Sequence, residues 1–143
     1  NWGWASKDSI LEKLPYSIDE TEKYIESHIQ IAEKLNKPLV LEEFGYPRDG
    51  FLFDRRGTVE ARNRYFGFIA ERVKKSSAVG GALAGANFWG WGGFADTLSG
   101  RFDWRSGDPY SGDPAQEPQG LYSVFASDTT TLEVIRRFGR TSF

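Results

Sequence analysis

The sequence contains no cysteine, no methionine and only one histidine, His28, among its 143 residues. Absent cysteine excludes a disulfide framework, a thiolate metal site and a cysteine nucleophile. His28 lies within a predicted helix, away from any serine motif or second ligand, so neither a catalytic triad nor a zinc site can be assembled. We therefore expect a structural or solvent-facing His28, no metal site and no cofactor.

Strong charge and long apolar runs are missing as well. The net charge is −2 and the sequence pI is near 5.5, which gives no electrostatic case for binding nucleic acid or an anionic membrane. The mean hydropathy is −0.50, and no apolar stretch approaches the roughly 20 residues of a membrane-spanning helix. The chain starts at Asn1 with no visible signal peptide, as the interior of a longer polypeptide would. Absent cysteine fits an exported bacterial enzyme, and the expected location is secreted or periplasmic.

Hydrophobic periodicity predicts helices alternating with strands. A loop over residues 1–16 leads into a helix over 18–36, for which Ser17 and Glu20 fit a capping box. Pro38 ends that helix pattern before the apolar run of a strand. The further predicted elements are a strand over 39–44, a helix over about 58–76, a strand in the latter half of 78–89, and a helix over roughly 130–138 capped by Ser127-Asp128. This succession is typical of an α/β fold with parallel strands.

A long irregular stretch is predicted from residue 90 to about 127. Structureless stretches beyond about 12–15 residues are uncommon in compact domains unless they are functional or disordered. The turns and aromatic residues of this stretch, Trp104 among them, favour an ordered loop that walls one side of a cleft. Its aspartates do not match the spacing of an EF-hand, so we interpret them as turn-forming residues.

The most informative segment is 37–45, KPLVLEEFG. A buried parallel strand is normally apolar throughout, so Glu42 and Glu43 at its carboxyl end are out of place structurally. In α/β folds, active sites lie at the carboxyl ends of strands, which predicts a catalytic carboxylate here. Neighbouring side chains on a strand point to opposite faces, so one of the two glutamates faces the site, and the residues alone do not say which.

Two strands cannot form a closed sheet or cover a core. A (β/α)8 barrel needs about 250 residues, well above the length of this chain. We therefore predict that residues 1–143 are the C-terminal portion of one barrel domain, about strands 7 and 8 with their flanking helices.

The segments KPLVLEEFG and GANFWGWGG resemble the seventh and eighth strands of clan A glycoside hydrolases, and most closely the family 5 endo-β-1,4-mannanases. The start of the chain, NWGW, resembles the segment after the sixth strand, and residues 117–125, EPQGLYSVF, resemble bacterial members. The resemblance implies that Glu43 is the nucleophile, with Leu39 and Leu41 below it facing the barrel interior. Glu42 would then point to the helix layer and find a partner there.

The resemblance also implies a second carboxylate that this chain does not contain. The family's acid/base glutamate follows an asparagine at the end of the fourth strand, and no Asn-Glu pair occurs in the sequence. A retaining glycosidase needs both carboxylates, about 5–5.5 Å apart. The chain alone is therefore expected to be inactive, and the missing N-terminal barrel segment is its expected partner.

Several aromatic side chains are candidate sugar platforms. Trp89 matches the tryptophan that floors the sugar subsite in the family, and Asn87 lies on the same predicted strand face. Trp91 and Trp2 are further candidate substrate-binding residues. A tryptophan at a strand end can instead pack the core, and Trp104 can be either a distal platform or a loop anchor.

Three functional interpretations follow. The first is a retaining glycoside hydrolase that cleaves β-1,4-mannosidic bonds in mannan-type polysaccharides. The second keeps the mechanism but acts on another β-glycan or as an exo-mannosidase. The third is a non-catalytic carbohydrate-binding module, and the predicted helices count against it because such modules are usually β-sandwiches.

Overall fold

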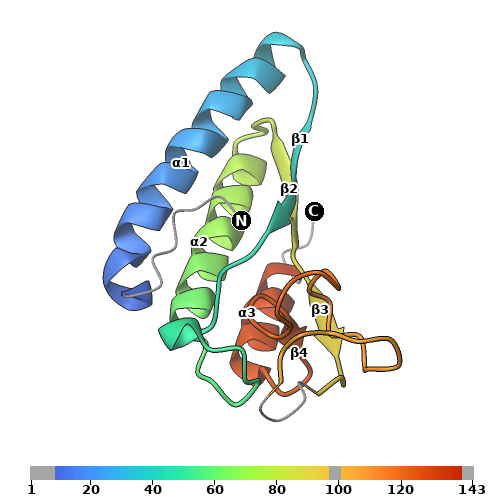
Figure 1. Cartoon of the computed structure of the whole chain (residues 1–143). Coiled ribbons are helices and arrows are strands. Elements are labelled where there is room, and N and C mark those ends of the chain that lie inside the picture. The colour runs from blue at the N-terminus through green and yellow to red at the C-terminus, as the bar shows by residue number, and fades with distance from the viewer. Residues whose placement is uncertain (1–8, 97–100, 140–143) are drawn as a thin grey trace.

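The structure is a computed structural model that describes residues 9–96 and 101–139. Its elements run in the order α1 (Ile10–Lys34), β1 (Leu39–Phe44), the short 3-10 helix η1 (Asp49–Phe51), α2 (Glu60–Ala78), β2 (Leu83–Phe88), β3 (Trp91–Gly93), β4 (Val124–Phe125) and α3 (Thr129–Gly139). The expected α/β succession is confirmed, with α2 placed between α1 and α3 (Figure 1). No helix in the described ranges is long and apolar enough to cross a membrane.

β1 and β2 pair in parallel, as the sequence predicts. Leu39 lies opposite Leu83, and Phe44 lies opposite Phe88. The pairing continues past β2, where the Trp89 amide donates a hydrogen bond to the Phe44 carbonyl at 2.7 Å. Within the described ranges this sheet has only two strands, so each strand keeps one edge without a strand partner.

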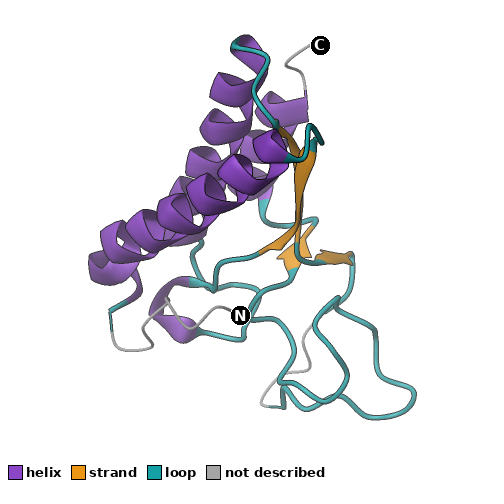
Figure 2. Cartoon of the chain, turned by 90° about the horizontal axis from the view of Figure 1, so that it is seen from above, coloured by secondary structure: helices purple, strands orange, loops and turns teal. Residues whose placement is uncertain are grey.

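The core lies between this strand pair and the helices. The buried face of α2 is the one that the periodicity selects: Tyr65, Phe66, Ile69 and Val73. Phe66 meets Phe44 edge-on, with ring centroids 4.8 Å apart. The helices gather on one side of the β1–β2 pair (Figure 2), and on β1 the side chain of Val40 is 46% exposed. One face of the strand pair therefore has a packed layer and the other does not.

The start of α1 differs from the sequence prediction. The helix begins at Ile10, eight residues before the predicted start, and contains Pro15. Ser17 is buried inside the helix, where its hydroxyl bonds the Tyr46 hydroxyl at 2.9 Å, so the capping box is wrong. Proline in a helix interior costs about 3 kcal/mol. Burial of Ile10 and Leu14 on the core side, each 3% exposed, offsets that cost.

The segment from 90 to 127 is more regular than predicted, because β3 and β4 at its two ends pair with each other. Between them, Phe102 packs against Phe53 with ring centroids 5.4 Å apart. The Trp104 ring nitrogen donates to the Asp108 carbonyl at 3.2 Å, and the Asp108 carboxylate accepts from the Arg105 amide at 2.8 Å. Trp104 is thus an anchor of this loop, and the turn-forming role of Asp108 is confirmed.

Two buried arginines share one carboxylate beneath the loop. Arg48 and Arg62 are both 0% exposed, and Asp128 pairs with them at 2.6 and 3.4 Å. Burial, with the neighbouring Arg48 charge, lowers the pKa of Arg62 to about 10, so its guanidinium stays charged at neutral pH. The Asp128 carboxylate, expected as a cap of α3, instead binds these arginines and the Phe125 amide. The cluster joins the end of β1, α2 and the start of α3.

Replacing Asp128 by asparagine should destabilise the protein strongly. The substitution preserves size but removes the carboxylate that pairs with two buried guanidinium groups, and breaking a buried pair in this way costs about 3–5 kcal/mol. Chemical denaturation measures the loss. Glu71→Ala, which removes the exposed Lys74–Glu71 pair on α2, is the control and should leave stability unchanged within error. An Asp128→Asn protein as stable as the control would show that the cluster does not hold the fold together.

Candidate active site

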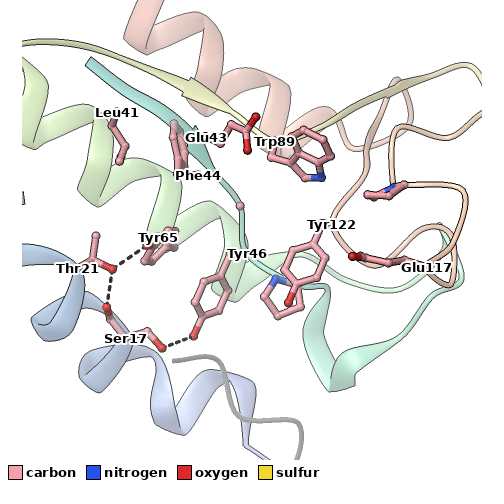
Figure 3. A pocket seen from close by; sticks show the side chains of 13 residues that line it. Ser17, Thr21, Leu41, Glu43, Phe44, Tyr46, Tyr65, Trp89, Glu117 and Tyr122 are labelled. Carbon is pink, nitrogen blue, oxygen red and sulfur yellow. Dashed lines mark hydrogen bonds between the residues drawn. The ribbon is translucent and has the colours of Figure 1, made fainter. Parts of the chain in front are cut away.

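A cavity of about 300 Å³ opens at the carboxyl ends of β1 and β2. It is lined by Ser17, Thr21, Leu41, Glu43, Phe44, Gly45, Tyr46, Pro47, Tyr65, Trp89, Pro114, Glu117 and Tyr122. These residues come from α1, α2, the end of β1, the end of β2 and the 90–127 loop (Figure 3). The cavity combines aromatic surface, hydroxyl groups and carboxylates, which is the chemistry that a sugar ring needs from its binding site.

Glu43 lines this cavity and Glu42 does not. Both glutamates are exposed, and Glu42 makes no hydrogen bond or ion pair with any described residue, so its expected partner in the helix layer is absent there. The prediction that side chains alternate strictly between the two faces of this strand, with Leu39 and Leu41 on the same face as Glu43, is also wrong. Leu39 and Leu41 pack against the helix-side core, and the register with β2 shifts between Leu41 and Phe44. The two glutamates are therefore distinguished by whether they line the cavity, and not by strand alternation.

Trp89 reaches the cavity from the end of β2. Its amide bond to Phe44 places it beside the residues that follow Glu43, and its side chain is half-buried. Gly45 permits this approach, because a Cβ atom there would lie 3.2 Å from the Trp89 carbonyl oxygen and 3.5 Å from the Tyr122 ring. Two neighbouring parallel strands thus bring a carboxylate and an indole to one cavity, as the sequence predicts.

Tyr46 and Tyr65 form the floor of the cavity toward α1. Their rings stack with centroids 4.7 Å apart, and their hydroxyls bond Ser17 at 2.9 Å and Thr21 at 2.7 Å respectively. Burial raises the pKa of Tyr46 and raises that of Tyr65 to about 12, so both hydroxyls are protonated at neutral pH. This floor is a fixed, uncharged surface.

The 90–127 loop forms the opposite wall through Pro114, Glu117 and Tyr122. In Figure 3 the Glu117 side chain points toward Tyr122, below Trp89. Sequence reasoning expected the loop to wall a cleft but did not select these three residues as site residues. The motif EPQGLYSVF is a sequence signal for Glu117 and Tyr122 alone, because nothing in local periodicity shows which loop side chains return to the strand ends.

Two other predicted substrate-binding residues, Asn87 and Trp91, do not line the cavity. Asn87 is exposed on β2, and Trp91, 53% exposed, lies in β3. Trp2 lies outside the described residues. His28 sits on α1, where its Nδ1 bonds the Tyr24 carbonyl at 2.7 Å. The described ranges contain no group of three or more His, Cys, Asp or Glu residues that could hold a metal ion.

Comparison with protein families shows which family the chain belongs to. Residues 1–141 match the family model described as "GH family 5 beta-mannosidase-like". The chain belongs to glycoside hydrolase family 5. Because the match covers nearly the whole sequence, it includes both strand ends that form the cavity.

Solved structures agree with this family 5 assignment. The glycoside hydrolase family 5 mannosidase from Rhizomucor miehei is similar to the chain, with a TM-score of 0.84 and 27% identity over 96% of this chain and 34% of the fungal chain. A glutamate-to-alanine variant of that enzyme in complex with mannosyl-fructose matches with a TM-score of 0.84 and 26% identity, covering 97% of this chain and 34% of that one.

Among curated proteins, the chain is similar to "Putative mannan endo-1,4-beta-mannosidase 9" of Oryza sativa subsp. japonica. The identity is 35% over 89 residues, which are 60% of this chain and 19% of the rice protein. This family 5 chain therefore spans about a third of the fungal enzyme and about a fifth of the rice relative. Its fold is accordingly part of the (β/α)8 barrel of the family.

Proposed function

We propose that this chain is the nucleophile-bearing part of a retaining glycoside hydrolase that cleaves β-1,4-mannosidic bonds, with Glu43 as the nucleophile. One observation carries the proposal. Glu43 and Trp89, at the ends of two adjacent parallel strands, line the same cavity in a chain of family 5. A carboxylate beside an aromatic platform provides what attack on an anomeric carbon requires: a nucleophile and a surface that orients the sugar ring.

The mechanism needs a second carboxyl group from outside this chain. In a retaining glycosidase one carboxylate attacks the anomeric carbon while a carboxylic acid, about 5–5.5 Å away, protonates the leaving oxygen. The same group, now a carboxylate, then accepts a proton from the water that releases the sugar from Glu43. We infer that it lies on a barrel segment preceding β1 and β2, which would be the seventh and eighth strands. The open strand edges and the coverage of 34% of the fungal enzyme support that inference.

The preferred substrate is a β-mannan or a mannooligosaccharide. The names of the matched family model, the fungal enzyme and the rice relative all refer to mannosidase activity. An exo-acting β-mannosidase is the second candidate, because the structural match over 96% of the chain is to an enzyme named a mannosidase. The described fold argues against a non-catalytic carbohydrate-binding module, because it consists of helices packed on parallel strands and not of a β-sandwich.

Product analysis of the intact enzyme, meaning this chain together with its preceding barrel segment, tests the proposal. Incubation with β-mannan, mannotriose and a β-1,4-glucan, followed by proton NMR of the first products, reports both substrate and stereochemistry. We expect β-configured mannose ends from the mannan substrates and slow or no cleavage of the glucan. Products of inverted configuration, or a preference for the glucan, would contradict the proposal. The ratio of mannose to longer products separates exo from endo action.

Replacing Trp89 by alanine should weaken turnover more than stability. Loss of a stacking surface costs about 1–3 kcal/mol by analogy with other ring-stacking platforms, so kcat/KM for mannooligosaccharides should fall clearly. Steady-state kinetics and thermal unfolding are measured on the same preparation. Trp91→Ala, which alters an indole outside the cavity, is the matched comparison and should have the smaller effect. A large drop in melting temperature with unchanged kcat/KM would show that Trp89 only packs the core.

A further inference from the structure

Tyr122 differs from the other two tyrosines of the cavity. Tyr46 and Tyr65 satisfy their hydroxyls within the protein, through Ser17 and Thr21. The Tyr122 hydroxyl has no hydrogen-bond partner among the residues that the structure describes, although the side chain lines the cavity. A tyrosine buried on one side usually finds a partner for its hydroxyl, so a free one facing a cavity indicates a group held for a ligand.

The backbone around Tyr122 is held on both sides. The Asp113 carboxylate, in a residue only 1% exposed, accepts from the Gly120 amide at 2.6 Å, the Ser123 hydroxyl at 2.6 Å and the Tyr122 amide at 3.3 Å. Arg62 donates to the carbonyl of the preceding residue, Leu121, at 2.7 Å. Such a support leaves the ring little freedom to leave the cavity.

The turn that carries Asp113 is itself fixed to the strand end. Gly112 has a φ of +97°, and a Cβ atom there would lie 2.9 Å from the Trp91 carbonyl oxygen. Only glycine fits a position that combines this backbone conformation with so close an approach. The loop thus rests against the chain that follows Trp89.

The hydroxyl of Tyr122 is protonated at neutral pH and can donate a hydrogen bond. Burial, assisted by the carboxylates of Glu117 and Asp113, raises the pKa of Tyr122 to about 12. A neutral hydroxyl can donate to one sugar oxygen and accept from a neighbouring sugar hydroxyl. It is therefore suited to hydrogen bonding with the hydroxyl groups of a sugar held in the cavity.

We propose that Tyr122 contacts the substrate, donating its hydroxyl hydrogen to an oxygen of a sugar held in this cavity, and that Asp113 is the positioning residue that aims it. The inference rests on the proposed function, because it takes the cavity beside Glu43 as the sugar site. It adds to that function a specificity-determining residue from the loop.

Tyr122→Phe in the intact enzyme tests the contact, because it removes one oxygen and keeps the ring. We expect kcat/KM for mannooligosaccharides to fall about 3- to 10-fold, as for a lost neutral hydrogen bond, with an unchanged melting temperature. Tyr110→Phe is the control, since Tyr110 belongs to the same loop, is 64% exposed and does not line the cavity. Equal kinetics for the two variants would overturn the inference.

Substrates lacking single hydroxyl groups identify the contacted atom. With the unmodified enzyme, kcat/KM for one monodeoxy mannoside should be lower than that for the parent mannoside. The factor should be about the same as the factor by which Tyr122→Phe lowers kcat/KM. Against Tyr122→Phe, that same analogue should show no further loss, because the two changes remove one interaction. Additive losses for every analogue would overturn the contact.

Asp113→Asn tests the positioning role in a double-mutant cycle with Tyr122→Phe. A residue that acts through Tyr122 should lower kcat/KM in the native background and have little effect on it when the hydroxyl is already gone. Its effect on melting temperature should be the same in both backgrounds. An equal kinetic loss in both would show that Asp113 is only structural.

The outcomes separate this inference from the proposed function. Retaining cleavage of mannan with no effect of Tyr122→Phe overturns the role of Tyr122 and leaves the function standing. If the enzyme cleaves a glucan instead, the mannan assignment fails, and the same pair of variants measured on that glucan decides the role of Tyr122. An enzyme that cleaves no β-glycan overturns both.

Discussion

Glu43→Gln in the intact enzyme lowers kcat by at least about 10³-fold, the scale of loss expected when a catalytic nucleophile is removed. Glutamine keeps the shape of the side chain but removes the negative charge that attacks the anomeric carbon. Because Glu43 is exposed and lines the cavity without holding the core together, the melting temperature should change little. Single-turnover kinetics on an activated mannoside, with thermal unfolding of the same sample, measure both quantities.

Glu42→Gln is the matched control for this result. The two glutamates are neighbours on β1 and both are exposed, but Glu42 does not line the cavity. We expect Glu42→Gln to keep kcat within a few-fold of the unmodified enzyme. Near-normal turnover in Glu43→Gln together with an inactive Glu42→Gln would reverse the assignment.

The second large effect concerns residues 1–143 on their own. Expressed alone they should show no hydrolysis of mannan, and they should aggregate or remain partly unfolded. The two strands of the described sheet leave open edges, which natural proteins normally pair or cover. The sequence also lacks the Asn-Glu pair of the family's acid/base residue. A size-exclusion profile and an assay with mannotriose measure both properties.

Co-expression with a preceding barrel segment that carries this Asn-Glu pair is the complementary experiment. It should yield a soluble complex that cleaves mannan. The same segment with its glutamate changed to glutamine should give a soluble but inactive complex, which separates folding from catalysis. Robust hydrolysis by purified residues 1–143 would contradict the account, because it would require an acid/base residue within the chain.

The sequence predicted those parts of the fold that depend on local pattern. The strand at 39–44 is confirmed to the residue, and the second helix is confirmed within two residues. The start of α1 was missed because a proline and a plausible capping box indicated a helix start there. The burial of Ile10 and Leu14 overrides both signals, and this burial depends on contacts with distant residues.

The site was predictable where chemistry and position coincide. The strand pattern selected the pair Glu42–Glu43, and the family resemblance singled out Glu43 and Trp89, both of which line the cavity. The strict strand alternation failed, since the pairing register shifts after Leu41. Tyr122 and Asp113 were not selected, because their roles depend on a loop that returns to the strand ends through buried hydrogen bonds. Such long-range contacts leave no periodic trace in the sequence.

Covalent trapping of the nucleophile tests the central claim most directly. A 2-deoxy-2-fluoro-β-mannosyl fluoride slows both chemical steps but carries a good leaving group, so the glycosyl-enzyme accumulates. Trypsin should release the labelled segment as residues 35–48, and fragmentation of this peptide separates Glu42 from Glu43. The account predicts one fluoromannosyl group on Glu43. A label on Glu42, a label outside this chain, or inactivation without a covalent adduct would contradict it.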